Sequence, residues 1–320
     1  MPSWDAQLAI AHTSDPVLAR LVSAIEDDNW DAIAAVGRRL STSVRRSIRV
    51  GLTGAAGAGK STLLAALSGA WPGDGRMGGI AVDPSSDMSG GAVLGDRFRL
   101  YGTRGAERPA DARLFLRSMA ARGSGKALSR HVALIATLFE EVGLSPVLME
   151  TAGAGQSDTR VKSWVDCLVL VLTPESGDVI QMLKAGLMEH ADLYVVNKAD
   201  RDGAQQFAAQ LRGLVASQHA HHPLAPARRV VLARADRADR DDLAPLISAI
   251  GEVASACKRS RHELWLEVID AYLAETVMDV VNSEMRTPQW SDAVARCASG
   301  ELSGAEVARR FQPAMTDLPG

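Results

Sequence analysis

The sequence predicts an α/β fold in which helices cover both faces of a mostly parallel sheet, with further helical segments at both ends of the chain. Unbroken apolar runs recur through the middle of the chain, and parallel strands that are buried on both faces have this appearance. Helical stretches, with apolar residues three and four positions apart, separate most of these runs. Alternation of the two patterns is typical of a parallel sheet with helices on both sides.

The elements are expected in the following order. Residues 1–46 form a helical segment, because LARLVSAIEDD and DAIAAVGRRL have helical spacing. Helical stretches, among them LLAALSGA, LSRHVALIATLFEEV and GAQQFAAQLRGLVASQ, then separate most of the strand candidates. The strand candidates are SIRVGLTG (47–54), GGIAVD (78–83), SPVLME (145–150), CLVLVLT (167–173), DLYVVNK (192–198) and RRVVLA (228–233).

The C-terminal part of the chain is expected to be helical from about residue 246. It contains the long amphipathic stretch ELWLEVIDAYLAETVMDVVNSEM. Before it, SQHAHHPLAPA (217–227) is expected to be an irregular loop. We therefore expect three parts: a helical segment over 1–46, a sheet domain over 47–250 and a helical arm over 251–320.

Composition narrows the classes of function. The net charge is −3, whereas nucleic-acid binders usually carry a basic surplus. The three cysteines, Cys167, Cys257 and Cys297, form no closely spaced pair, which favours a reducing compartment. The N-terminus lacks the pattern of a signal peptide, and no apolar run approaches 18 residues. We expect a cytoplasmic protein that binds neither nucleic acid nor membrane.

A phosphate-binding loop follows the first strand candidate and precedes a helix. It matches G-x-x-x-x-G-K-[ST], whose glycines let the backbone wrap phosphate oxygens at the start of a helix. In this role Lys60 reaches the β- and γ-phosphates and Ser61 is a ligand of Mg²⁺. The nucleotide-binding residues expected here are Gly54, Ala55, Ala56, Gly57, Ala58, Gly59, Lys60, Ser61 and Thr62.

The base is expected to be guanine. Asn197, Lys198 and Asp200 form N-K-x-D at the end of an apolar strand. The aspartate accepts two hydrogen bonds from the ring N–H and 2-amino group of guanine, and adenine lacks that donor pair. We therefore expect GTP and GDP rather than ATP. A second base-binding loop is expected at Ala233 and Arg234, although the usual Ser-Ala-Lys or Ser-Ala-Leu sequence is absent there.

Acidic residues near the phosphates are candidates for the metal and hydrolysis centre. Asp83 ends one strand candidate, Asp96 follows it in the chain, and Glu150 ends another. Carboxylates at such positions hold Mg²⁺ directly or through water, and Glu150 could also orient the attacking water. The competing interpretation of each is a loop cap or a solvated charge. Gly153 would let the backbone approach the γ-phosphate.

Several motifs together resemble one family. The chain is similar to the MeaB/ArgK branch of the metallochaperone P-loop GTPases, relatives of the methylmalonic aciduria type A protein. That group carries Glu-x-x-Gly, here Glu150 to Gly153, where many GTPases have Asp-x-x-Gly. The resemblance covers about residues 48 to 205 and rests on GLTGAAGAGKST, AVDPSSDMSGGAVLGDR, FLRSMAARG, VLMETAGAGQSD, LVLTPESGDVIQMLKAG and EHADLYVVNKAD.

The resemblance implies a P-loop GTPase that acts as a chaperone. Such proteins hydrolyse GTP to GDP and phosphate. They thereby gate the delivery of adenosylcobalamin to a cobalamin-dependent acyl-CoA mutase and protect that mutase. The cofactor is handled through the cobalamin-binding domain of the partner. The family also implies a homodimer, with the C-terminal helices (258–320) as the dimerisation arm.

The resemblance also assigns roles to loops. Residues 84–96 and 151–158 correspond to switches I and II, and 174–186 to a third switch that senses the partner, in which Gln181 and Lys184 are polar. This third switch is more apolar than is usual in the family. The client mutase could therefore be of the isobutyryl-, 2-hydroxyisobutyryl- or ethylmalonyl-CoA type instead of the methylmalonyl-CoA type.

The expected catalytic residues are Lys60, Asp96, Glu150 and Gln156, of which Gln156 is the weaker candidate for positioning water. Hydrolysis is expected to need a supplied arginine, with Arg117 and Arg122 as internal candidates.

Two alternatives stay open at this point. One is a GTPase that inserts nickel or zinc into enzymes, although the chain lacks the cysteine clusters of such proteins and offers only the histidines within 219–222. The other is a kinase, against which N-K-x-D and the switch motifs argue.

Overall fold

The computed structural model describes residues 2–42, 47–83, 113–120, 131–151, 161–175, 187–221, 228–236 and 240–257, and a few single positions between 263 and 299. The chain divides into two compact units, residues 1–264 and 265–320. Nearly all described residues belong to the first unit, and the fold and the site described below lie within it.

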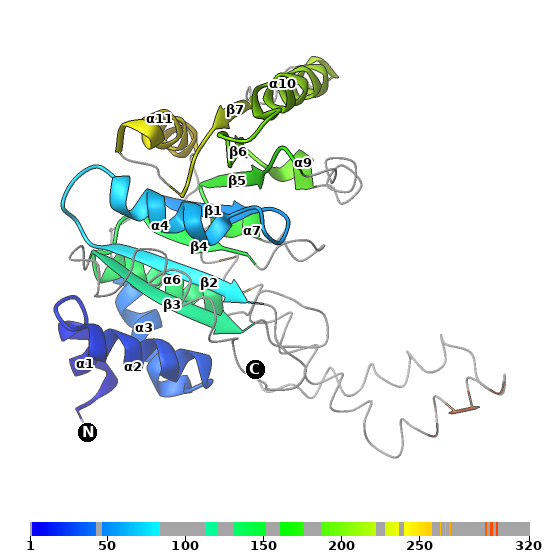
Figure 1. Ribbon diagram of the computed structural model, residues 1–320. Helices are drawn as coiled ribbons and strands as arrows, with labels where there is room; N and C mark the ends of the chain where they lie inside the picture. The colour runs from blue at the N-terminus through cyan, green and yellow to red at the C-terminus, as the bar shows by residue number, and fades with distance from the viewer. Residues whose placement is uncertain are drawn as a thin grey trace. The chain divides into compact units, whose positions relative to one another are not determined.

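Seven strands form one sheet in the order β3-β2-β4-β1-β5-β6-β7 (Figure 1). Every neighbouring pair is parallel. Strand order reverses around β1, and ligands bind at the carboxyl ends of the strands beside such a point. The strands are β1 (Arg49–Thr53), β2 (Met77–Asp83), β3 (Leu114–Ala120), β4 (Val147–Glu150), β5 (Cys167–Leu172), β6 (Leu193–Val196) and β7 (Arg229–Leu232).

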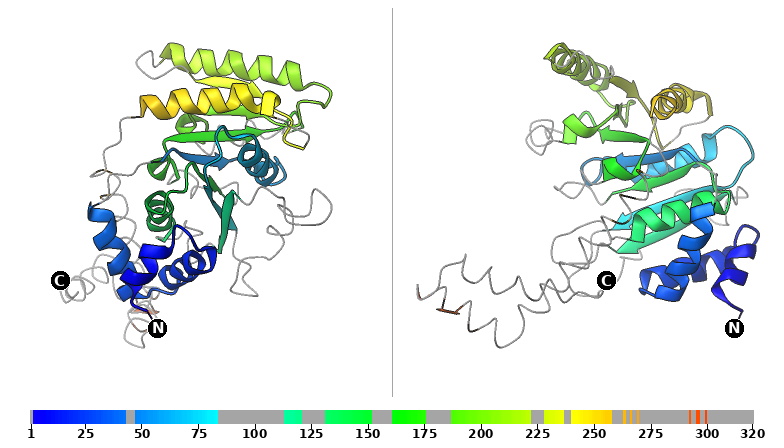
Figure 2. Two further views of the ribbon diagram at one scale, coloured as in Figure 1. Left: turned by 90° about the vertical axis from the view of Figure 1, so that its left-hand side faces the viewer. Right: turned by 180° about the vertical axis from the view of Figure 1, so that it is seen from behind.

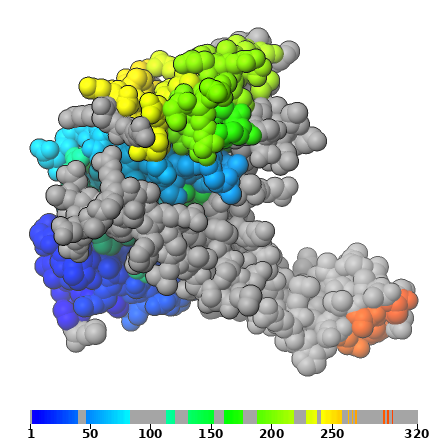
Figure 3. All heavy atoms as spheres, viewed as in Figure 1, coloured from blue at the N-terminus to red at the C-terminus, as the bar shows by residue number. Residues whose placement is uncertain are grey.

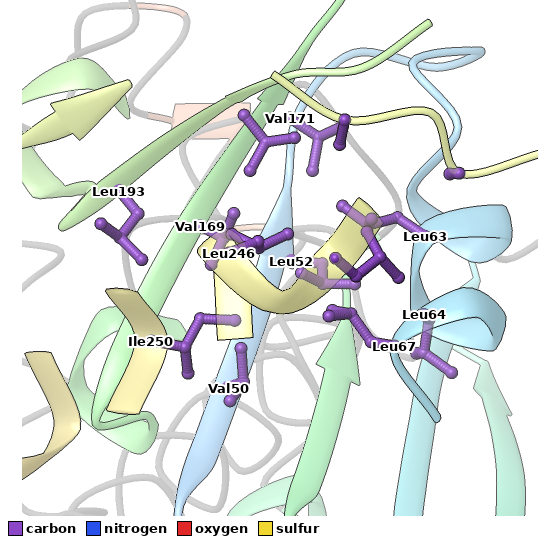
Figure 4. Packing of buried hydrophobic residues seen from close by; sticks show 14 of the residues in the cluster. Val50, Leu52, Leu63, Leu64, Leu67, Val169, Val171, Leu193, Leu246 and Ile250 are labelled. Atoms are coloured by element: carbon purple, nitrogen blue, oxygen red, sulfur yellow. The ribbon is translucent and has the colours of Figure 1, made fainter. Parts of the chain in front are cut away.

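Helices cover both faces of the sheet, which confirms the predicted fold class. On one face, α4 and α11 pack on apolar side chains of β1, β5 and β6, among them Val50, Val169 and Leu193 (Figure 4). On the other, α10 packs on the alternate side chains of β5 and β6, such as Leu170 and Tyr194. The helices are α1 (Trp4–Ile10), α2 (Asp15–Glu26), α3 (Trp30–Thr42), α4 (Lys60–Ala70), α6 (His131–Glu141), α7 (Val161–Trp164), α9 (Leu187–His190), α10 (Ala204–His221) and α11 (Arg240–Ala256).

The N-terminal helices lie at one end of the first unit, and α10 and α11 lie at the other (Figures 2 and 3). Buried Leu18, Leu21 and Ile25 of α2 have the helical spacing that the sequence showed. Both α2 and α3 contact α6. At the carboxyl end of α2, Ser23 and Glu26 accept hydrogen bonds from the Arg117 guanidinium of β3.

All six predicted strands are present, and β3 is a seventh strand that the sequence pattern did not predict. Among the described strands it lies at the edge of the sheet and pairs with β2 alone. An edge strand has a hydrogen-bonded neighbour on one side only, and charged side chains are common in it. Arg117 and Ser118 interrupt the apolar residues of β3, and most of its side chains are only partly buried. The apolar pattern that revealed the central strands was therefore absent.

Two expected boundaries are also corrected. The α10 helix continues to His221, so residues 217–221 of the expected irregular loop are helical, and 222–227 lie outside the described residues. The α11 helix begins at Arg240, before the position near 246 where the helical pattern becomes clear. Its first turn contains Asp241 and Asp242, and acidic residues there favour a helix start electrostatically without adding apolar periodicity. In the part of the chain that the structure describes, no helix has the length and apolar character to cross a membrane.

Candidate nucleotide-binding site

The predicted site residues come together at the carboxyl ends of neighbouring strands. Gly54 follows β1, Glu150 ends β4, and Asn197 follows β6. Since β4, β1, β5 and β6 are adjacent and parallel, their carboxyl ends share one edge of the sheet. This is the edge at which open α/β sheets bind ligands.

The loop between β1 and α4 depends on its glycines. Gly54, Gly57 and Gly59 have φ angles of 145°, 79° and 88°, in the region that residues with a side chain rarely adopt. At Gly54 and Gly59 space is limiting as well. A Cβ at Gly54 would collide with the carbonyl oxygen of Val171, and one at Gly59 with Nδ2 of Asn197. The loop therefore lies directly against the ends of β5 and β6.

Lys60 begins α4 and is buried, with 6% of its surface exposed. Its Nζ donates hydrogen bonds to the carbonyl oxygens of Gly54 (3.0 Å) and Ala55 (3.1 Å). These bonds hold the ammonium group within the loop. The first N–H groups of a helix have no partner inside the helix and favour an anion. Together, the loop, the lysine and the start of α4 have the geometry and charge that a phosphate-binding site requires.

Ser61 and Glu150 meet between α4 and β4. The Ser61 hydroxyl donates to Oε1 of Glu150 over 2.7 Å, and the Glu150 side chain is buried. Close by in the chain, the hydroxyls of Thr53 and Thr151 are hydrogen-bonded at 3.2 Å and join the ends of β1 and β4. Hydroxyl and carboxylate oxygens are ligands that Mg²⁺ prefers, so the residues present fit a magnesium site. The two threonines were not predicted as site residues, because their position at strand ends is the only signal that they carry in the sequence.

Asn197 connects the phosphate loop with the loop that follows β7. Its Nδ2 donates to the carbonyl oxygen of Ala58 at 2.9 Å, and its Oδ1 accepts from the backbone N–H of Ala235 at 3.1 Å. Lys198, whose φ is 54°, donates from Nζ to the carbonyl oxygen of Gly57 at 3.0 Å. The first two residues of N-K-x-D therefore bind protein groups, and the half-exposed Asp200 carboxylate is the member that is open to a base.

The segment predicted as a second base-binding loop lies beside Asp200. The backbone N–H of Ala199 donates to the carbonyl oxygen of Ala233 at 3.0 Å. Nε of Arg234 lies 3.9 Å from Oδ1 of Asp200. Contacts between these two loops could not be inferred from sequence spacing, because more than 30 residues separate them.

Another ion pair links the N-K-x-D loop to the segment after β5. Arg201 donates to Glu175, at the start of the segment 174–186. This hydrogen bond lowers the pKa of the Glu175 carboxyl and raises the pKa of the Arg201 guanidinium. Both side chains are about half exposed, so solvent screens the interaction and the pair contributes little to stability.

Two more of the predicted residues, Asp83 and Arg117, lie on the neighbouring strands β2 and β3. Asp83 ends β2 and its backbone pairs with Ala120 of β3. Arg117, one of the two candidates for an internal arginine, donates to Ser23 and Glu26 of α2, so the N-terminal helices already bind its guanidinium. Outside the described residues lie Asp96, Arg122, Gly153, Gln156, Gln181 and Lys184.

Over the described ranges, no three or more His, Cys, Asp or Glu side chains are grouped so that they could hold a metal ion.

Comparison with protein families gives one model that matches residues 18–290, described as methylmalonyl-CoA mutase-associated GTPase MeaB. Among individual relatives, a Pyrococcus horikoshii protein is 41% identical over 188 residues, which are 58% of this chain and 57% of that protein. The GTPase ArgK of Escherichia coli is 40% identical over 157 residues, which are 49% of this chain and 46% of ArgK.

The methylmalonic aciduria type A homolog of mouse mitochondria is 40% identical over 157 residues, which are 49% of this chain and 37% of the mouse protein. The chain thus matches about half the length, or less, of these relatives. Among solved structures, the crystal structure of LAO/AO transport system kinase has a TM-score of 0.64 and 21% identity, and covers 98% of this chain and 97% of its own. At this identity the likeness shows a shared fold.

Proposed function

The chain belongs to the MeaB family of methylmalonyl-CoA mutase-associated GTPases, and from this premise we propose that it binds GTP and hydrolyses it to GDP and phosphate. One observation carries the proposal. The buried side chain of Asn197, the first residue of N-K-x-D, joins the phosphate loop, at Ala58, to the loop after β7, at Ala235. The group that would bind phosphates and the carboxylate that would read guanine are thereby held in one fixed arrangement, as a guanine nucleotide requires.

In this proposal, the residues of the loop and α4 hold the phosphates. The N–H groups of the loop and the ammonium group of Lys60 face the β- and γ-phosphate oxygens. Lys60 would exchange its bonds to Gly54 and Ala55 for stronger charge-assisted ones to phosphate. Asp200 accepts from the ring N–H and the 2-amino group of guanine, and this selects against adenine.

The acidic residues serve the metal and the water. Mg²⁺, when bound, would neutralise charge that develops on the phosphate oxygens. Ser61 would hold it, with Glu150, Asp83 and Asp96 as the surrounding carboxylates. Glu150 is close enough to Ser61 to accept its hydrogen bond, and we propose that it also orients the attacking water. Gly153 and Gln156 are proposed to lie next to the γ-phosphate.

We further propose that GTP hydrolysis gates the delivery of adenosylcobalamin to a cobalamin-dependent acyl-CoA mutase and protects that mutase. The description of the family supports a mutase partner, as does the relative named for methylmalonic aciduria type A. The client would be a methylmalonyl-, isobutyryl-, 2-hydroxyisobutyryl- or ethylmalonyl-CoA mutase, recognised through its cobalamin-binding domain.

The remaining parts of the chain take their proposed roles from the same family. Gln181 and Lys184, in the segment 174–186, would sense the partner. The C-terminal arm, 251–320, would form a homodimer in the cytoplasm, and 47–250 would form the GTPase domain behind the helical segment 1–46.

GTP turnover by the purified full chain tests the proposal, with ATP as the competing substrate. Each reaction is run alone and with candidate mutases or their isolated cobalamin domains, and Lys60→Ala is the control variant. We expect slow turnover that is selective for GTP, lost in Lys60→Ala, and accelerated by one mutase. Normal turnover by Lys60→Ala would refute the site. GTP turnover that is indifferent to every mutase would leave the hydrolase and refute the chaperone role.

A further inference from the structure

The Asp200 carboxylate has a cationic neighbour on a different loop. Nε of Arg234, after β7, lies 3.9 Å from Oδ1 of Asp200, after β6, and the two side chains are 44% and 43% exposed. Backbone bonds on both sides set this position. Ala233 accepts from the N–H of Ala199, and Ala235 donates to the side chain of Asn197. Arg234 is thus held beside Asp200 by its two neighbours in the chain.

The geometry is that of an ion pair without a hydrogen bond. Donor and acceptor atoms in a hydrogen bond lie within about 3.2 Å of each other, so at 3.9 Å Nε of Arg234 does not occupy the lone pairs of Oδ1 of Asp200. The nearby positive charge favours one orientation of the carboxylate among those that a half-exposed side chain can adopt.

The other cations near Asp200 have partners of their own. Lys198 donates to Gly57 of the phosphate loop, and Arg201 donates to Glu175. At position 233 the chain has alanine, whose methyl group cannot donate a hydrogen bond to the aspartate. The charge of Arg201 also interacts with Asp200, but its guanidinium is hydrogen-bonded to Glu175. In the described part of the loop after β7, Arg234 is the basic residue that faces Asp200.

From this arrangement we infer that Arg234 is a positioning residue for guanine recognition and acts through Asp200. It holds the carboxylate oriented toward the 2-amino edge of the base, and it need not touch the nucleotide itself. The inference rests on the proposed function, since it presupposes that the site binds guanine nucleotides.

Comparison of GDP with inosine diphosphate isolates this role. The hypoxanthine base of inosine diphosphate keeps the O6, N7 and ring N–H of guanine and lacks only the 2-amino group. The ratio of the two dissociation constants therefore measures the bond between Asp200 and that amino group. A residue that touches O6 or a phosphate would affect both ligands equally, whereas one that orients Asp200 changes the ratio.

The experiment measures both dissociation constants for the full chain and three variants by competition against a fluorescent GDP analogue. For Arg234→Ala we expect the preference for GDP over inosine diphosphate to fall about threefold, the effect of an exposed ion pair. Arg234→Lys should keep part of it. The matched control is Arg229→Ala on β7, which breaks a similarly exposed ion pair with Glu252 of α11 and should leave the preference unchanged.

Salt gives a second measurement. At about 1 M salt, where the screening length is about 3 Å, the preference of the unaltered chain should approach that of Arg234→Ala. An unchanged or larger preference in Arg234→Ala would overturn the inference, and so would equal weakening of both ligands. If the unaltered chain failed to prefer GDP to ADP, the proposed function itself would fail. The two results are therefore distinguishable.

Discussion

At the residue scale, the length and the charge of the side chain at position 150 both matter to the proposed site. Glutamate at position 150 is one methylene longer than the aspartate found in many GTPases, and its Oε1 reaches the Ser61 hydroxyl at 2.7 Å. The carboxylate is buried, and burial of a charge is costly unless hydrogen bonds or a cation compensate it. A bound divalent ion at Ser61 would provide that compensation.

A Glu150→Gln variant separates charge from shape. Glutamine keeps the length and can still accept from Ser61, but it removes the negative charge that would orient water and attract the metal. We expect GDP affinity within about threefold of the unaltered chain and turnover about 100-fold lower, the range of a lost general base. Phosphate release in single-turnover reactions and GDP titration measure the two quantities. Glu189→Gln, at an exposed glutamate of α9, is the control, and normal turnover in Glu150→Gln would exclude Glu150 from the mechanism.

At the scale of elements, the β1–α4 loop and the loops after β6 and β7 behave as one unit. Gly59 allows Asn197 to approach the phosphate loop, and Asn197 in turn binds Ala58 and Ala235. A change in the first loop should therefore reach the base-binding loops.

Gly59→Ala and Gly57→Ala test this coupling, because both glycines have φ near 80° to 90°. The left-handed conformation costs each alanine about 1–2 kcal/mol. A Cβ at Gly57 meets no atom within 4 Å, whereas one at Gly59 collides with Asn197. We expect Gly59→Ala to weaken GDP binding at least about tenfold more than Gly57→Ala, since it also displaces the Asn197 hydrogen bonds. Equal losses of affinity in isothermal titration would contradict the coupling.

Another pair of elements, β1 and α6, is joined by a buried ion pair at the amino end of β1, the end opposite the phosphate loop. Arg49 of β1 makes two hydrogen bonds, of 2.7 and 2.8 Å, to the carboxylate of Glu140 on α6, and its backbone N–H donates to Asp166. The two side chains are only 2% and 4% exposed.

Glu140→Gln should strongly destabilise the fold, because it leaves the buried guanidinium without a charged partner. We expect the free energy of unfolding to fall by about 3–5 kcal/mol. Asp5→Asn removes the carboxylate of the Arg38–Asp5 pair, whose side chains are both 63% exposed, and should cost less than about 1 kcal/mol. Urea denaturation followed by circular dichroism gives both values. Similar losses in the two variants would show that burial of the Arg49 pair does not matter.

At the scale of the whole molecule, every described part of the site lies in the unit formed by residues 1–264. The described residues of the phosphate loop, the base-binding loops and the strands that carry them all precede the end of α11 at Ala256. Nucleotide binding should therefore be separable from the proposed dimerisation arm.

A chain truncated after Cys257 tests that separation. We expect it to bind GDP within about threefold of the full chain, because the sheet and its covering helices are retained. If the arm forms the dimer, light scattering should give twice the 33.9 kDa protomer mass for the full chain and a monomer for the truncated one. Loss of GDP binding would place part of the site in the removed segment. A truncated dimer would place the interface in the first unit.

The sequence alone determined the local chemistry and most of the elements. The phosphate loop, N-K-x-D and the strand that ends at Glu150 were all recognisable. Each is formed by residues that are close together in the chain, so its pattern can be read from the sequence. The family resemblance was likewise evident from motifs, and the family model confirms it.

Only the tertiary structure decided which of these residues meet. The edge strand β3, the contact of Ser61 with Glu150, the bonds of Asn197 to both loops, and the place of Arg234 beside Asp200 join segments far apart in the chain. Such contacts follow from strand order and packing. They therefore cannot be predicted from the periodicity or spacing of residues within one segment.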